Sequence, residues 1–311
     1  MRKELARKQK SDNATGTSMN IKVNLFIIGA MKSGTTSLHE YLNDHPQISM
    51  STEKEPGYFV DELRKDRDEE WYQGLFQERE NIRYFGEAST HYAKYPLYKG
   101  VANRIYQYNP EAKLIYIMRN PFNRIVSHYW HAVRTAHSGG EAASISSAIK
   151  SHRDYQDFSN YPLQLQQYYQ FFQPKNIYVV TFEQLTKDTE SVTREIFKWL
   201  DLHTDVKLSS IDKTFNAQPE RIVGRAGLGI LNKIQYSKVW GAISPFIPKG
   251  IKNTANNAAY ITIDKEKQNQ QIHKLKQEME DTFINQVREL KLLTGRDFQE
   301  WPEYNKNEQQ P

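Results

Sequence analysis

A short turn near the start of the sequence contains two glycines, a lysine and several hydroxyl side chains. Gly29 and Gly34 frame this turn, an apolar run precedes it and a helical stretch follows it. At such a strand-to-helix junction, backbone N–H groups and the helix dipole favour a bound anion. The candidate phosphate-binding side chains and amides are those of Lys32, Ser33, Gly34, Thr35, Thr36 and Ser37.

The same turn departs from a nucleotide-hydrolysing P-loop in the position of its lysine. A P-loop has Lys directly after the second glycine, where this chain has Thr35, and the lysine here lies inside the turn, at Lys32. The apolar run 114–118 then ends in Arg119 and Asn120 rather than in an aspartate that could hold magnesium. We therefore expect a site that binds phosphate groups without a metal ion.

Arg119 is a second candidate for phosphate binding. It follows a buried strand, and the carboxyl ends of strands are where open α/β sheets bind ligands. Its planar guanidinium can take two phosphate oxygens at once. Ser127 lies eight residues further, about two helical turns on, and can add a hydroxyl donor. Arg124 points elsewhere on this helix, and we expect it to be structural.

The two motifs together resemble those of sulfotransferases that use 3′-phosphoadenylyl sulfate (PAPS). Residues 32–38 (KSGTTSL) look like the 5′-phosphosulfate loop, and residues 119–129 (RNPFNRIVSHY) look like the 3′-phosphate motif. Weaker matches to the carbohydrate-type branch of this family continue across residues 21–301. The resemblance implies PAPS as the co-substrate, with Lys32 stabilising charge at the transferring group.

Glu55 is the candidate general base on the same resemblance. Transfer to a hydroxyl requires a group that removes the acceptor proton, and Glu55 fits the Lys/Arg-Glu-x-His pattern of carbohydrate sulfotransferases. Gly57 stands where that pattern often has His, and Ala88 stands where heparan-type relatives have Lys. The first departure puts the exact acceptor in doubt, and the second argues against a highly sulfated polymer. The alternative is that Glu55 is a solvated acid in a charged loop.

Several basic residues near these motifs have less defined roles. The resemblance implies that a late basic loop reaches the nucleotide 3′-phosphate, and Arg221 and Arg225 are the candidates for it here; two solvated arginines are an equal alternative. His91, His128 and His131 are expected to serve packing or the surface rather than as the base. His128 and His131 are spaced like a metal pair, but no third ligand is evident.

The predicted secondary structure around these residues alternates between strand and helix. Nearly continuous apolar runs at 23–28, 114–118 and 177–180 read as buried parallel strands, and 84–87 adds a shorter one. Helices are expected at 35–43, 121–135, 191–200 and from about 264 to 295, the last with one apolar face. We expect an α/β three-layer sandwich with a central parallel sheet, the P-loop-containing nucleotide-hydrolase-like fold.

Composition supports one globular domain with short tails. The 311 residues are 38% hydrophobic and contain no cysteine, which excludes disulfides, cysteine zinc sites and thiol nucleophiles. The net charge is +5, of which +4 falls in residues 1–10, so no nucleic-acid partner is expected. We expect a basic tail at 1–20, the domain at 21–301 and a second tail at 302–311, in a cytoplasmic protein without a transmembrane segment or a visible signal peptide.

The expected function is sulfuryl transfer from PAPS to a hydroxyl or amine of a sugar, glycolipid or small natural product. A kinase using the same turn is one rival, which the position of Lys32 disfavours. A nucleotide- or glycan-binding protein without activity is another, which the joint presence of Lys32, Glu55, Arg119 and Ser127 disfavours. The variable loops leave the acceptor and the oligomeric state open.

Overall fold

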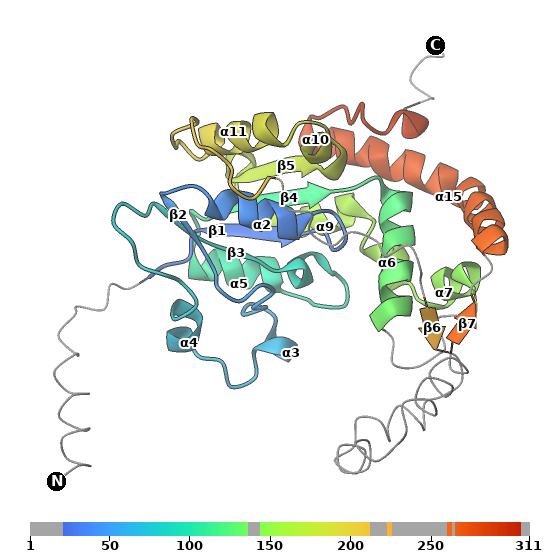
Figure 1. Cartoon of the computed structure of the whole chain (residues 1–311), viewed down its shortest axis with the longest axis horizontal. Helices are drawn as coiled ribbons and strands as arrows, with labels where there is room; N and C mark the ends of the chain where they lie inside the picture. Colours follow the sequence, from blue (N-terminus) through green and yellow to red (C-terminus); the bar gives the residue numbers. More distant parts are fainter. Residues whose placement is uncertain (1–20, 136–143, 212–222, 226–259, 263–264, 306–311) are drawn as a thin grey trace, which may run out of the picture.

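A five-stranded, all-parallel sheet forms the centre of the computed structural model, which describes residues 21–135, 144–211, 223–225, 260–262 and 265–305. The strand order is β2-β3-β1-β4-β5, with β1 in the middle of the sheet (Figure 1). The five strands are β1 (Leu25–Gly29), β2 (Ile48–Met50), β3 (Tyr84–Ala88), β4 (Lys113–Met118) and β5 (Ile177–Thr181). The expected parallel sheet is confirmed, and β2 is a strand that the sequence analysis did not predict.

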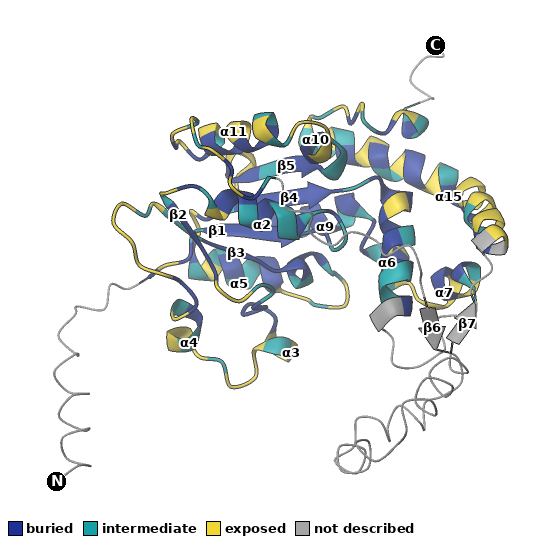
Figure 2. Ribbon diagram, viewed as in Figure 1, coloured by how far each residue is buried: buried dark blue, intermediate teal, exposed yellow. Residues whose placement is uncertain are grey.

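Side chains on successive residues of β1 enter two separate cores, which is why the strand reads as a continuous apolar run. Leu25 and Ile27 pack on one face of the sheet, and Phe26 and Ile28 pack on the other. Burial on both faces is typical of parallel sheets covered by helices. Figure 2 shows the central strands buried between more exposed helices.

Helices cover both faces and complete three layers. One core includes residues of α2 (Thr35–Asn43), α10 (Phe182–Lys187) and α11 (Thr189–Trp199). The other core includes residues of α5 (Val101–Tyr108), α6 (Pro121–Thr135), α7 (Ile145–Ser151), α9 (Tyr161–Tyr169) and α15 (Lys265–Thr294). The shorter elements are α3 (Asp61–Arg64), α4 (Glu69–Gln73), α8 (Asp154–Asp157), η1 (Thr90–Ala93), η3 (Pro174–Asn176) and η5 (Pro302–Tyr304).

The helices anticipated at 35–43 and 121–135 have these bounds in the structure. Helix α11 begins two residues earlier than expected, because the Asp188 side chain accepts a hydrogen bond from the Ser191 N–H and caps the helix. The apolar face of α15 is buried as expected, with Phe283 and Leu290 at most 1% exposed. No helix among the described residues is long and apolar enough to cross a membrane.

Packing of the domain continues past residue 301. Trp301 is fully buried and donates from its indole N–H to Glu183 Oε2 at 3.0 Å. Glu303 accepts a hydrogen bond from Asn120, and Tyr304 is buried. The segment anticipated as a tail from residue 302 therefore begins with packed residues. The basic segment 1–20 and residues 306–311 lie outside the described residues, as does most of 203–259.

Candidate active site

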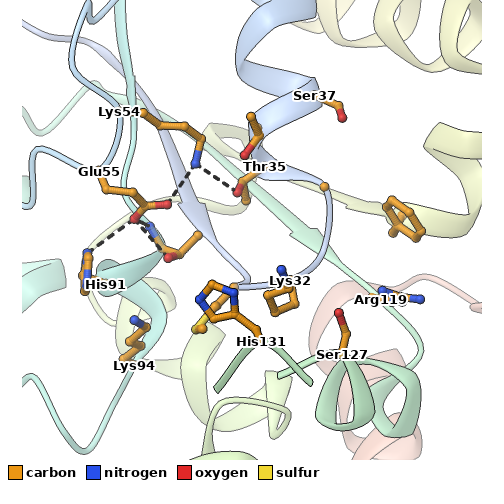
Figure 3. A pocket seen from close by; sticks show the side chains of 15 residues that line it. Lys32, Thr35, Ser37, Lys54, Glu55, His91, Lys94, Arg119, Ser127 and His131 are labelled. Carbon is orange, nitrogen blue, oxygen red and sulfur yellow. Dashed lines mark hydrogen bonds and ion pairs between the residues drawn. The ribbon is translucent and has the colours of Figure 1, made fainter. Parts of the chain in front are cut away.

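The carboxyl ends of all five strands meet at one edge of the sheet, and a cavity of about 700 Å³ opens there (Figure 3). The loops after these strands supply most of its wall, since all five strands run in the same direction. The lining residues are Met31, Lys32, Gly34, Thr35, Thr36, Ser37, Lys54, Glu55, Thr90, His91, Lys94, Arg119, Ser127, His131 and Phe182.

Both glycines of the first turn are required by its geometry. Gly29 has φ +153° and Gly34 has φ +92°, backbone conformations that residues with a side chain rarely adopt. A Cβ on Gly29 would lie 2.9 Å from the Cβ of Ala93, and one on Gly34 would lie 2.8 Å from the Phe182 ring. Gly34 precedes α2, whose N-terminus has no side-chain cap. The uncapped first-turn N–H groups, together with the helix dipole, therefore suit an anion.

The turn brings most, but not all, of its expected side chains to the cavity. The lining contains Lys32 and the three consecutive residues of Thr35–Ser37, and Gly34 contributes its backbone. Ser33 is absent from the lining, because its side chain is fully buried. The Ser33 N–H donates instead to the Ala30 carbonyl within the turn at 3.2 Å.

Arg119 and Ser127 line the cavity at the end opposite Glu55 (Figure 3). Arg119 follows β4, and its guanidinium lies 4.9 Å from the centre of the Phe182 ring. Stacking on this ring holds the planar group at the cavity wall. Arg124 differs, since it is fully buried and donates to Ser159 and to the Tyr155 carbonyl. The expectation that Arg124 is structural agrees with this position.

Glu55 has an ionised carboxylate surrounded by donors. Lys54 Nζ lies 2.9 Å from Oε1, and the N–H and hydroxyl of Thr90 donate to Oε2 at 2.6 and 3.0 Å. His91 Nδ1 lies 3.3 Å from Oε2, an ion-pair distance without well-aligned hydrogen-bond geometry. Burial alone would raise the pKa of Glu55, but His91 and Lys54 outweigh burial and lower it to about 2. Glu55 can therefore accept a proton at neutral pH, as a weak base.

Lys54 connects the carboxylate to the turn. Its Nζ also lies 3.5 Å from Thr35 Oγ1, so one ammonium contacts both groups (Figure 3). Glu55 has φ +60°, the left-handed region that non-glycine residues rarely adopt. The strain and the donors together fix the carboxylate on the cavity wall. Glu55 is therefore a partly buried, hydrogen-bonded carboxylate rather than a solvated one.

The three histidines named in the sequence analysis differ in their position relative to the cavity. His91 and His131 line the cavity, whereas His128 is buried outside the lining. Burial, with Arg124 as the next cause, lowers the pKa of His128 to about 2, so this histidine is neutral. Among the described residues, no group of three His, Cys, Asp or Glu side chains could hold a metal ion.

The side chains of the two late arginines lie outside the described part of the structure. Arg221 lies outside the described residues. Arg225 lies in the two-stranded antiparallel sheet of β6 (Val223–Arg225) and β7 (Tyr260–Thr262), where its backbone pairs with Tyr260. Its side chain is outside the described part, so a role at the 3′-phosphate stays a prediction for both residues.

The fully buried carboxyl group of Glu87 is connected through Ser89 to the loop that contains Glu55. Glu87 accepts hydrogen bonds from the hydroxyls of Tyr72, Tyr92 and Ser89 at 2.6, 2.6 and 2.7 Å. Ser89 Oγ in turn accepts from the Gly57 N–H at 3.0 Å, two residues after Glu55. Burial raises the pKa of Glu87 to about 7, although the three hydroxyl donors oppose this rise.

Glu87→Gln is expected to remove a pH dependence of stability. A carboxyl whose pKa is raised from 4.5 to about 7 stabilises the fold below pH 4.5 and loses that contribution as the pH rises through 7. The loss amounts to roughly 3 kcal/mol. Urea unfolding at pH 5 and pH 8 should show this fall in the wild type and in the control Glu80→Gln, which alters an exposed acid. An unchanged fall in Glu87→Gln would contradict the role of Glu87.

The fold and the turn together define the class of protein to which this chain belongs. A parallel α/β sheet with an anion-binding turn at its carboxyl edge, and with the lysine inside that turn, is a P-loop-like nucleotide-binding protein without the P-loop lysine position. The comparisons with known proteins identify the family within this class. The model of the sulfotransferase domain matches residues 22–283, and the chain belongs to this family.

Relatives and a solved structure agree with this membership. The chain is 37% identical over 114 residues to a membrane-associated sulfotransferase of Dictyostelium discoideum, covering 36% of this chain and 23% of that protein. It is 32% identical over 103 residues to heparan sulfate glucosamine 3-O-sulfotransferase 6 of Mus musculus, and this match covers 33% of this chain and 28% of that protein. The matches thus span about a quarter of these relatives. A sulfotransferase structure from Alicyclobacillus acidocaldarius matches with a TM-score of 0.64 and 25% identity. The match covers 91% of this chain and 99% of that chain.

Proposed function

We propose that this protein transfers the sulfuryl group of PAPS to an acceptor hydroxyl or amine. The observation that carries the proposal is that Lys32, in the anion-binding turn, and the Glu55 carboxylate line one cavity, with Arg119 at its far end. A kinase would need magnesium and its ligands. The proposed reaction needs no metal, because Lys32 supplies the cation at the transferring group. A carbohydrate or small molecule is the proposed acceptor, as the heparan sulfate relative suggests.

Each end of the cavity has a distinct role in the proposed reaction. Arg119 and Ser127 bind the 3′-phosphate, and the α2 N-terminus with Thr35–Ser37 holds the 5′-phosphosulfate. Lys32 stabilises the charge that develops on the leaving phosphate oxygen. These contacts orient the sulfur toward the end of the cavity that contains Glu55.

Glu55 completes the proposed transfer at the acceptor. The acceptor oxygen or nitrogen forms a bond to sulfur, in line with the sulfur–oxygen bond to the phosphate, which breaks. The acceptor proton passes to Glu55, and the leaving group is adenosine 3′,5′-bisphosphate (PAP). Lys54, which bridges Glu55 and Thr35, keeps the base beside the turn. A protein that only bound nucleotide would not require a carboxylate held here.

Arg119→Ala is expected to weaken binding of PAP about 10- to 100-fold, because charge-assisted hydrogen bonds to the 3′-phosphate are lost. Binding of adenosine 5′-phosphosulfate, which lacks that phosphate, should stay nearly unchanged. Calorimetric titration of both nucleotides into the wild type and the variant measures the difference. Equal losses for the two nucleotides would place Arg119 away from the 3′-phosphate.

A further inference from the structure

One cation of the cavity has no role in the proposed transfer. Lys32 and Arg119 serve the donor, and Lys54 forms its ion pair with Glu55 at 2.9 Å. Lys94, at the C-terminal end of η1, lines the same cavity. Figure 3 shows it on the side of Glu55 and His91, away from Arg119. Lys94 therefore lies at the acceptor end.

Within the described part of the chain, no hydrogen bond or ion pair reaches the ammonium of Lys94. Its nearest ring contact is with Phe158, whose centre lies 5.8 Å from Nζ. Burial lowers the pKa of Lys94 despite the opposing charge of Glu55. Glu55, the carboxylate that lines the described cavity wall, makes its hydrogen bonds to Lys54 and Thr90 rather than to Lys94. An anion that binds beside such a half-buried ammonium forms a charge-assisted hydrogen bond with it, and this offsets the cost of burying the charge.

Charges of both signs lie near Lys94: Glu55 and Asp154 raise its pKa, and Arg124 lowers it. Buried His128 is kept neutral by burial first and then by the positive charges of Arg124 and Lys94. Arg124 donates to a hydroxyl and a carbonyl, and no ion pair with an acid is found for it among the described residues. Ala88 is fully buried in β3 and does not line the cavity, whereas Lys94 does.

We propose that Lys94 binds an oxyanion of the acceptor, a carboxylate or a sulfate ester close to the hydroxyl or amine that receives the sulfuryl group. This proposal rests on the proposed function, because the acceptor end is defined by the donor site. Donation from the Lys94 ammonium to the oxyanion would orient the acceptor nucleophile toward Glu55. A charge-assisted hydrogen bond of this kind favours the anionic acceptor over a neutral analogue about 10- to 100-fold.

The test measures ternary complexes of PAP-loaded protein with three matched sugars. The probes are p-nitrophenyl β-glucoside, p-nitrophenyl β-glucuronide and p-nitrophenyl β-glucoside 6-sulfate, each titrated calorimetrically. We expect the glucuronide or the 6-sulfate to bind at least about tenfold more tightly than the glucoside in the wild type. Lys94→Met and Lys94→Gln should abolish this preference and leave the affinity for the glucoside and for PAP unchanged. Lys99→Met, which alters an exposed lysine five residues on, should retain the preference.

The outcomes separate the two proposals. Failure of the wild type to bind PAP would overturn the proposed function itself. Normal PAP binding without a preference for either anionic sugar, or a preference that persists in Lys94→Met, would overturn the role of Lys94 alone. A Lys94→Met protein with weaker binding of PAPS but not of PAP would place this ammonium on the transferring sulfuryl group, and would also contradict the proposal. Tighter binding of the glucuronide than of the 6-sulfate, or the reverse, identifies the preferred oxyanion.

Discussion

Lys32→Ala is expected to lower the turnover number for sulfuryl transfer about 10²- to 10³-fold, the usual effect of losing one preorganised electrostatic group. The variant removes the cation that lies inside the anion-binding turn. In the proposed transfer, charge develops there on the leaving phosphate oxygen. Lys32 also has φ +69°, so alanine must adopt the same left-handed backbone. Turnover of PAPS with an accepted substrate, measured alongside a thermal melt, checks the prediction.

The matched control for this variant is Lys22→Ala. Lys22 is exposed before β1 and lies outside the cavity lining, so its loss should leave turnover unchanged. A folded Lys32→Ala protein with turnover like that of the wild type would contradict the role of Lys32.

Glu55→Gln should lower turnover about 10²- to 10⁴-fold and preserve PAP affinity, because it removes the proton acceptor and keeps the size of the side chain. The amide oxygen can still accept from the Thr90 N–H, so the loop geometry should persist. Turnover with PAPS and titration with PAP together measure the two parts of the prediction.

Glu53→Gln provides a control in the same loop. Glu53 is exposed and pairs with Arg67 at 3.4 Å, outside the cavity lining. This variant should therefore turn over normally. Near-normal turnover of Glu55→Gln would instead require another base, and His91 and His131, which both line the cavity, would be tested next.

The sequence could bring Lys32 and Arg119 to one edge of the sheet because the signals for their positions are local. The turn at Gly29–Gly34 and the Arg119 junction each consist of one strand end and one helix start, and the apolar runs placed both strands in one parallel sheet. The inclusion of Ser33 shows the limit of such reasoning. Residue spacing did not reveal that its side chain is fully buried in the turn.

The acceptor half depends on contacts between distant segments. Thr90 and His91 reach the Glu55 carboxylate only because β3 lies between β2 and β1 in the sheet. The sequence analysis missed β2, which has only three residues, and therefore could not place these ends together. Lys54 is adjacent to Glu55 in the sequence but has no defined role there, and Lys94 belongs to no motif. The strand order brings both lysines to the cavity wall, which their sequence positions alone do not indicate.

Calorimetric titration of nucleotides into the wild-type protein tests the central claim most directly. PAP is titrated in the presence of EDTA, and ATP is titrated with magnesium. The arrangement of Lys32, Arg119 and the uncapped α2 N-terminus predicts that PAP binds without metal and at least about tenfold more tightly than ATP, since one nucleotide matches both ends of the cavity. Tight binding of ATP that requires magnesium, with no detectable binding of PAP, would contradict the sulfotransferase function proposed here.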